Sequence, residues 1–127
     1  MRLFRGRPLY IRIRRNHIHV RDVSNGKEVD LSASEPFSSE RLIIANFSNA
    51  KHMLIQAAKE TLHTLSSRLF HADAVIHQID IFADGLSEVE KRLLQELGSS
   101  LGLARCLIYE GQELSDNEVK AYLDKAS

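Results

Sequence analysis

The chain has 127 residues, of which 43% are hydrophobic and 27% charged, and this length and composition are typical of one globular domain. Its 17 basic and 17 acidic residues give a formal net charge of zero, which excludes a strongly basic nucleic-acid binder and an acidic tail protein. A single cysteine excludes an internal disulfide, and no apolar run approaches the ~18 residues that cross a bilayer. We therefore expect a cytoplasmic protein without a membrane span.

The zero net charge hides a basic N-terminal segment. Residues 1–21 contain no acidic residue and seven arginines: Arg2, Arg5, Arg7, Arg12, Arg14, Arg15 and Arg21. The rest of the chain has an equal excess of acidic over basic residues, which brings the net charge to zero. We expect residues 1–8 to form a flexible basic tail, followed by a single domain over residues 9–127.

The first predicted elements are two strands joined by a tight turn. Apolar and polar residues alternate over residues 9–14 and again over residues 17–21, and a period of two predicts half-buried strands. The link at residues 15–16 is short enough for a two-residue hairpin turn. That turn pairs Arg12 with His19 and puts the basic and histidine side chains on one sheet face.

A second hairpin is predicted at Asn25-Gly26, because both central residues of a type I′ turn need a positive φ. Residues 28–31 then return as a third strand. This register pairs Arg21 with Asp30 and gives the same apolar face as the first hairpin. The agreement of the two registers favours a three-stranded meander.

A long helix and a fourth strand follow. Ser48 or Asn49 can cap a helix that runs to about Phe70, and residues 75–82 read as a strand, mainly apolar and ended by Asp84-Gly85. The helix has an apolar stripe at helical spacing, which consists of Leu54, Ala58, Leu62, Leu65 and Leu69.

Two capping boxes mark the last helices. Ser87 with Glu90 begins a helix that Gly102 can end in a left-handed conformation. Residues 106–109 form a fifth strand, and a second box at residues 115–118 opens a helix that runs through Leu123.

The order is β-β-β-α-β-α-β-α, which predicts a mixed α/β fold with a five-stranded mixed sheet. Crossover helices make the later strands parallel to the first. Strand order 3-2-1-4-5 would be that of the ribonuclease H-like fold, which is also the core of an actin subdomain.

Several segments carry a resemblance to known families. The stretches RLIIANFSNAKHML and ADGLSEVEKRLLQELGSSLGLARCLIYE, together with SEPFSS, are similar to parts of the first subdomain of the bacterial actin MreB. The stretches YIRIRRNHIHVRDV, RLIIANF and LSEVEKRLL resemble a small gammaproteobacterial family called YjaA, over nearly the whole chain. These resemblances imply an actin-like core and a role in stress response or in envelope and shape physiology.

The sequence departs from both catalytic families that share this fold. An actin-like ATPase holds Mg²⁺ and phosphate with an aspartate and a Gly-rich turn at the first hairpin, and a ribonuclease H-type nuclease needs a carboxylate on the first strand. Arg12 stands in that place, and an arginine cannot ligate a metal because it only donates. Glu60 and Asp84 remain, but two dispersed carboxylates do not make a site. We therefore expect a non-catalytic domain without cofactor or metal, with an unseen pocket near Asp80 or Asp84 as the remaining enzymatic hypothesis.

Other reactive side chains have structural explanations. His17 and His19 have the spacing of a partial metal site, but a tetrahedral site needs further ligands. Cys106 on a strand is expected to be a buried, inert small hydrophobe. Ser87 is explained as a helix cap.

The basic sheet face is the candidate binding site. Its members share one side of the predicted hairpin or flank the first turn: Tyr10, Arg12, Arg14, Arg15, His17, His19 and Arg21. We expect them to bind a protein partner or a second copy of the chain. The alternative is a nucleic-acid-binding module, since single-strand binders combine basic grooves with aromatic rings. If the fourth strand lies beside the first, we expect Asp80 to come within reach of Arg12. The arginines expected to stay unpaired are Arg2, Arg5 and Arg7 of the tail, together with Arg14 and Arg15 near the first turn.

Overall fold

The computed structural model describes residues 7–40, 42–62, 72–80, 85–103 and 105–125. Five strands and three helices follow one another in these segments: β1 (Arg7–Arg14), β2 (His17–Asp22), β3 (Glu28–Ser32), α1 (Phe47–Leu62), β4 (Ala72–Gln78), α2 (Glu88–Ser100), β5 (Arg105–Tyr109) and α3 (Asp116–Lys125). Their order is the predicted β-β-β-α-β-α-β-α.

The strands form one mixed sheet in the order β3-β2-β1-β4-β5, as predicted. The first three strands are an antiparallel meander, and β4 and β5 run parallel to β1. α1 connects β3 to β4 and α2 connects β4 to β5. Each helix returns the chain to the end of the sheet where the preceding strand began, so the strands that it joins run parallel.

The first hairpin has the predicted register. Arg12 lies opposite His19 and Arg14 opposite His17, across the two-residue turn at Arg15-Asn16. Asn16 has a φ of 53°, a left-handed conformation that asparagine tolerates better than most residues. Its side-chain oxygen accepts hydrogen bonds from the backbone N–H groups of residues 37 and 38, both at 2.8 Å, so the turn also fixes the loop after β3.

The register predicted for the second hairpin is wrong by two residues. Arg21 lies opposite Glu28, and Asp30 lies opposite His19. The loop is longer than a two-residue turn: the N–H of Asp22 donates to the carbonyl of Lys27 at 2.7 Å. Gly26 has a φ of 79°, whereas Asn25 has no positive φ, which excludes a type I′ turn. A shift of two keeps every side chain on its predicted face.

The reason for the longer loop lies in the last residue of β2 and the residue that follows it. Asp22 is fully buried, and its carboxylate accepts hydrogen bonds from the N–H and hydroxyl of Ser24 and pairs with Arg7. Val23 leaves the strand and is buried against Tyr10. These contacts end β2 before a two-residue turn can form.

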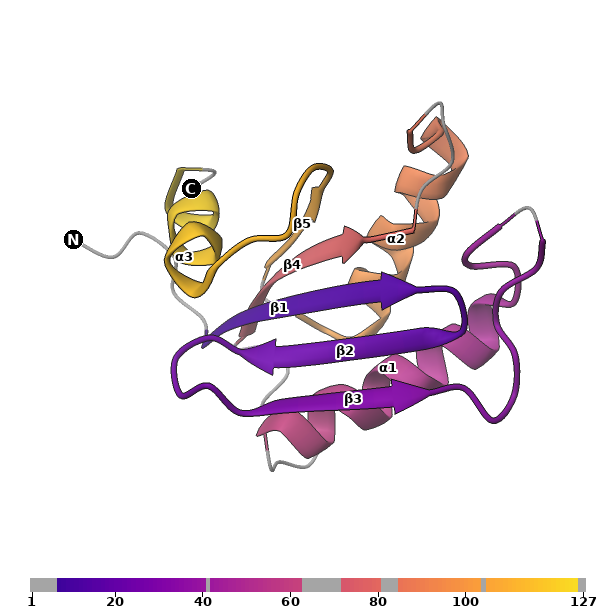
Figure 1. Ribbon diagram of the computed structural model, residues 1–127, viewed down its shortest axis with the longest axis horizontal. Helices are drawn as coiled ribbons and strands as arrows, with labels where there is room; N and C mark the ends of the chain where they lie inside the picture. The colour runs from indigo at the N-terminus through magenta and orange to yellow at the C-terminus, as the bar shows by residue number, and fades with distance from the viewer. Residues whose placement is uncertain (1–6, 41, 63–71, 81–84, 104, 126–127) are drawn as a thin grey trace.

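Helices cover the two faces of the sheet unequally. α1 and α2 pack side by side on one face, behind the sheet in Figure 1, whereas α3 covers one end of the other face. The main core lies under α1 and α2, and its fully buried large residues include Leu9, Ile11, Ile13, Ile18, Leu54, Ile76, Leu94 and Leu97. A second, smaller core joins Val119 and Leu123 of α3 to the opposite face.

Several element boundaries differ from the predictions. β1 begins at Arg7, so residues 7 and 8 belong to the sheet and not to a tail; residues 1–6 lie outside the described residues. Asn46 caps α1 in place of Ser48 or Asn49, since its side-chain oxygen accepts the N–H of residue 49 at 3.0 Å. The predicted continuation of α1 to Phe70, with Leu65 and Leu69, lies outside the described residues.

The fourth strand is displaced toward the N-terminus. β4 occupies residues 72–78 and all seven of its residues are buried, whereas the sequence predicted residues 75–82. Residues 81–84 lie outside the described residues. Because β4 is central and covered on both faces, its sequence shows no alternation that could set its register.

The predicted caps of the last two helices are confirmed. Ser87 and Glu90 form a reciprocal capping box at α2, and Ser115 and Glu118 do so at α3. Gly102 follows α2 with a φ of 72°, the left-handed conformation expected after a helix end. Within the described segments, no helix is both long enough and apolar enough to cross a membrane.

Candidate functional site

The structure contains the predicted hairpin face, and rows of charged and histidine side chains run across it from strand to strand. Arg12, His19 and Asp30 lie in register on β1, β2 and β3. Arg12 donates to Nδ1 of His19 at 3.1 Å. Together with Arg14 and His17, these residues line a hollow of about 130 Å³.

Carboxylates neutralise this face. Arg12 and Arg14 share Glu113, at 3.0 and 3.3 Å, and Arg14 also approaches Asp80 at 3.9 Å. His17 contacts Asp30. Three arginines of this face, at positions 12, 14 and 21, contact four carboxylates, at positions 28, 80, 113 and 116. The face is therefore not the cationic platform that the N-terminal arginines suggested.

Arg21 connects the hairpin to the last helix. Its guanidinium binds Asp116 with two bonds, Nε to Oδ1 at 2.8 Å and Nη2 to Oδ2 at 2.9 Å, and it also contacts Glu28. The hydrogen bond from Arg21 holds the pKa of Asp116 below its usual range. The hydrogen bond from His19 lowers the pKa of Glu28, and the hydrogen bond from Arg21 lowers it by a smaller amount.

The expected pairing of Asp80 with Arg12 is wrong, and so is the expectation that Arg7 and Arg14 stay unpaired. Asp80 contacts Arg14 and accepts the backbone N–H of Arg15 at 2.9 Å, whereas Arg12 pairs with Glu113. The guanidinium of Arg15 donates to the carbonyls of residues 39 and 40, and Arg7 pairs with Asp22. Arg2 and Arg5 lie outside the described residues.

Tyr10 is not exposed on this face. Its side chain is only 2% exposed, because α3 covers it. The hydroxyl lies 2.7 Å from Nδ1 of His77 and accepts the N–H of Leu114 at 3.1 Å. His77 Nε2 in turn lies 2.9 Å from the carbonyl of Gly111. The ring is therefore unavailable for stacking on a nucleic-acid base.

Burial controls the protonation of this pair. Desolvation raises the pKa of Tyr10, with smaller opposing effects from Leu114 and Arg12. Desolvation also lowers the pKa of His77, against a smaller rise from the Gly111 carbonyl. Both groups are held neutral, and their hydrogen bonds fasten the loop between β5 and α3 to the sheet.

Cys106 is half-buried, and not fully buried as predicted. It packs against the main core, and burial raises the pKa of its thiol to about 12. Gly98 of α2 lies directly over it, since a Cβ at Gly98 would overlap the sulfur. A thiol with so high a pKa has almost no nucleophilic thiolate near neutral pH.

The remaining chemical candidates lie apart. Glu60 is on α1, Asp80 follows β4 and contacts Arg14 of the first hairpin, and Asp84 lies outside the described residues. No group of three or more His, Cys, Asp or Glu side chains within the described segments is arranged to hold a metal ion.

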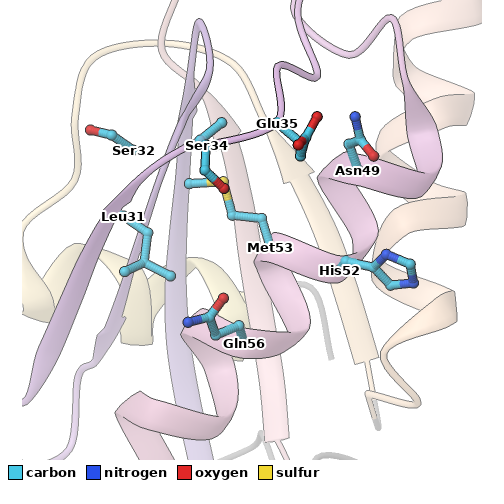
Figure 2. A pocket seen from close by; sticks show the side chains of 9 residues that line it. Leu31, Ser32, Ser34, Glu35, Asn49, His52, Met53 and Gln56 are labelled. Atoms are coloured by element: carbon cyan, nitrogen blue, oxygen red, sulfur yellow. The ribbon is translucent and has the colours of Figure 1, made fainter.

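The edge of the sheet at β3 is a feature that the sequence prediction missed. β3 is the terminal strand, and α1 runs behind it. Two hollows lie between them, one of about 320 Å³ near Leu31 and Met53 and one of about 480 Å³ near Val29 and Glu60. Figure 2 shows Met53 and Gln56 reaching from α1 toward β3, whereas His52 points away from it. Residues of α1 at spacings typical of one helix face line these hollows: Asn49, Met53 and Gln56 the first, and Glu60 the second.

One signal in the sequence pointed to this edge. The alternation in β3 is regular, with Glu28, Asp30 and Ser32 between Val29 and Leu31, and two acids on a short strand are typical of an unpaired sheet edge. The structure confirms a strand in which exposed and half-buried residues alternate.

The comparisons with known proteins identify a relative and no broader family model. No family model matches the chain. The chain is 38% identical to the uncharacterized protein YjaA of Escherichia coli (strain K12), in an alignment that covers 91% of this chain and 95% of the relative. The identity extends over almost the full length of both proteins, and the chain therefore belongs to the YjaA family.

Proposed function

We propose that this domain is a non-catalytic binding module that takes up a protein partner at the β3 edge. The observation that carries the proposal is the open strand β3 with α1 behind it and two hollows between them. An exposed strand offers backbone hydrogen bonds to a partner, and neighbouring pockets receive its side chains.

The state of the reactive groups supports a binding role over a catalytic one. Cys106 is held as a thiol by burial. Tyr10 and His77 have partners for all of their polar atoms. A general acid or nucleophile must reach its substrate, and these three side chains are directed into the fold.

The sheet order supports a ribonuclease H-like fold as part of this proposal. The order 3-2-1-4-5 with β4 and β5 parallel to β1 is the arrangement on which that fold is built. Arg12 lies in the middle of β1, where the catalytic members of the fold carry a metal-binding carboxylate. The proposal therefore includes a scaffold shared with the actin subdomain, its metal-dependent chemistry lost, working in the cytoplasm.

The charge balance of the hairpin face favours a protein over a nucleic acid. A phosphate-binding surface needs unpaired arginines or lysines. Here Arg12, Arg14 and Arg21 are each bound to carboxylates. Binding a phosphate backbone would first have to break these pairs.

Site-specific photo-crosslinking in native cells tests the proposal. A photoreactive residue replaces Ser32 at the open edge, and the matched control places it at Gln95, an exposed position of α2. We expect discrete protein adducts from position 32 and none from position 95. Adducts from position 95 alone, or from neither position, would refute binding at this edge.

A further inference from the structure

The backbone of β3 has three residues whose polar groups point away from the sheet. Hydrogen bonds join Asp22 to Lys27 and Asn16 to Ala33 at the two ends of the β2–β3 pair. Bonded pairs alternate along an antiparallel ladder. Val29 and Leu31 therefore bond to β2, as every second residue must. The N–H and C=O groups of the residues between and beside them, Glu28, Asp30 and Ser32, point outward.

These outward groups are open within the part of the chain that the structure describes. No hydrogen bond to the backbone of Glu28, Asp30 or Ser32 occurs among those residues. The opposite edge differs: at β5 the hydroxyl of Tyr122 donates to the backbone carbonyl of Ile108 at 3.0 Å. β3 is thus the edge better prepared for an added strand.

The charge along this edge is negative. The side chains of Glu28 and Asp30 are 46% and 57% exposed, and each carboxylate keeps lone pairs beyond those used by His19, Arg21 and His17. Glu35 and Glu60 line the two hollows, where Lys27 is the one lysine or arginine among the described lining residues. A basic strand would complement this edge.

Self-pairing of β3 is disfavoured by the same charges. Two copies related by a two-fold axis pair their edges antiparallel. Centred on β3, this arrangement puts Asp30 directly opposite Asp30 of the second copy, and like charges directly opposite each other destabilise a sheet. The charges on β3 therefore disfavour its pairing with β3 of a second copy of the chain.

We propose that β3 takes up an extended peptide segment in which basic and apolar residues alternate, and that this segment forms an added strand. This inference rests on the proposed function and specifies its partner. The basic side chains lie beside Glu28 and Asp30 on the hairpin face. The apolar side chains point to the other face, beside Val29 and Leu31, toward Met53 in the hollow of about 320 Å³ shown in Figure 2.

The test uses a short fluorescein-labelled peptide in which lysine and valine alternate, measured by fluorescence anisotropy with the full chain. One control peptide has glutamate in place of lysine, and a second has N-methyl groups on alternate backbone nitrogens. We expect binding of the first peptide alone, together with slower hydrogen exchange at the amides of Asp30 and Ser32. Equal binding of all three peptides would overturn the proposal.

Two variants at one position separate charge from backbone bonding. Asp30→Ala removes the carboxylate, and Asp30→Pro also removes the outward N–H; proline is tolerated where the N–H of an edge strand faces solvent. We expect Asp30→Ala to weaken binding about threefold, as for an exposed ion pair. We expect Asp30→Pro to weaken it about fivefold more, as for one hydrogen bond. Circular dichroism checks that both variants are folded, and equal affinities of the two would refute strand addition.

The failure of this inference is distinguishable from failure of the proposed function. If position 32 gives adducts in cells but the lysine–valine peptide does not bind, the proposed function stands, because a protein binds at the edge. The inference that this partner is a basic segment is then refuted. A dimer in sedimentation that Asp30→Pro dissociates would identify a second copy as the occupant and refute the basic segment.

Discussion

The hydroxyl of Tyr10 donates a hydrogen bond to Nδ1 of His77 across 2.7 Å. The direction of this hydrogen bond follows from the second ring nitrogen of His77. Its Nε2 lies 2.9 Å from the carbonyl oxygen of Gly111, which can only accept a hydrogen bond. Nε2 therefore carries the hydrogen of a neutral ring, and Nδ1 is the acceptor. Protonation of His77 would leave the hydroxyl hydrogen of Tyr10 without its acceptor, in a site that burial already makes unfavourable for charge.

The first prediction is a loss of stability in mild acid. Desolvation lowers the pKa of His77 in the folded protein below the ordinary value of 6.5, so between the two pKa values the unfolded chain binds more protons. The contribution of His77 is complete above pH 6.5 and declines as the pH falls through the interval down to the folded pKa. Urea unfolding from pH 7.5 to pH 5 measures it.

His77→Gln is the matched control, because its amide retains one acceptor and one donor without titrating in this range. We expect the free energy of unfolding of this variant to depend less on pH than that of the wild type. The other histidines remain in both proteins, so their contributions cancel in the comparison. Parallel pH profiles of the two proteins would contradict the assigned protonation state.

The second prediction concerns the contact between α2 and β5. A Cβ at Gly98 would overlap the sulfur of Cys106 and lie 2.9 Å from its Cβ. We expect Gly98→Ala to destabilise the protein by about 1–3 kcal/mol through overpacking. Cys106→Ala removes the sulfur, so the double variant should be more stable than the sum of the single changes implies. Thermal unfolding of the four proteins measures this coupling, and simple additivity would contradict the contact.

The third prediction concerns the first hairpin turn. Asn16 supplies both a left-handed backbone and an acceptor for two N–H groups of the next loop. Asn16→Gly keeps the conformation and loses the acceptor, Asn16→Asp keeps both, and Asn16→Ala loses both. We expect losses of about 0, 2 and 3 kcal/mol for Asp, Gly and Ala, from about 1 kcal/mol per hydrogen bond and about 1 kcal/mol for the left-handed residue. Equal stability of the Gly and Ala variants would contradict the backbone contribution.

Local patterns predicted this fold where each segment had its own signal. Alternation fixed the face of each hairpin residue, and the two capping boxes fixed the starts of α2 and α3. The shift in the second hairpin was not predictable from Asn25-Gly26, because it depends on Asp22 and Val23 finding buried partners elsewhere in the fold. Tertiary contacts overrode the turn preference there.

The candidate site was less predictable than the fold, because its properties depend on what covers it. The sequence placed the arginines and histidines on one face but could not show that α3 buries Tyr10. It also could not show that Glu113, far along the chain, reaches Arg12 and Arg14. The openness of β3 depends on the whole strand order, which no single segment encodes.

The last prediction concerns the attachment of α3 by Arg21 and Asp116. The two parallel hydrogen bonds need the planar fork of arginine, so Arg21→Lys should behave like a loss and not like a conservative change. Because the side chains are 27% and 40% exposed, we expect either Arg21→Lys or Arg21→Gln to cost only about 0.2–1 kcal/mol at low salt. The difference from the wild type should shrink in 1 M NaCl, where the Debye length is about 3 Å.

The same variants report on the carboxylate. The hydrogen bond from Arg21 lowers the pKa of Asp116 in the folded protein below its ordinary value of 3.8. The ion pair therefore stabilises the fold above that pH, and this contribution is lost as the pH falls through the folded pKa. In Arg21→Gln, carbon-detected NMR titration should show the pKa of Asp116 rising toward 3.8, and hydrogen exchange should become faster in the first turn of α3. An unchanged Asp116 pKa in this variant would show that Arg21 does not hold the helix, and α3 would then be held by the packing of Val119 and Leu123 and by its hydrogen bonds to β5.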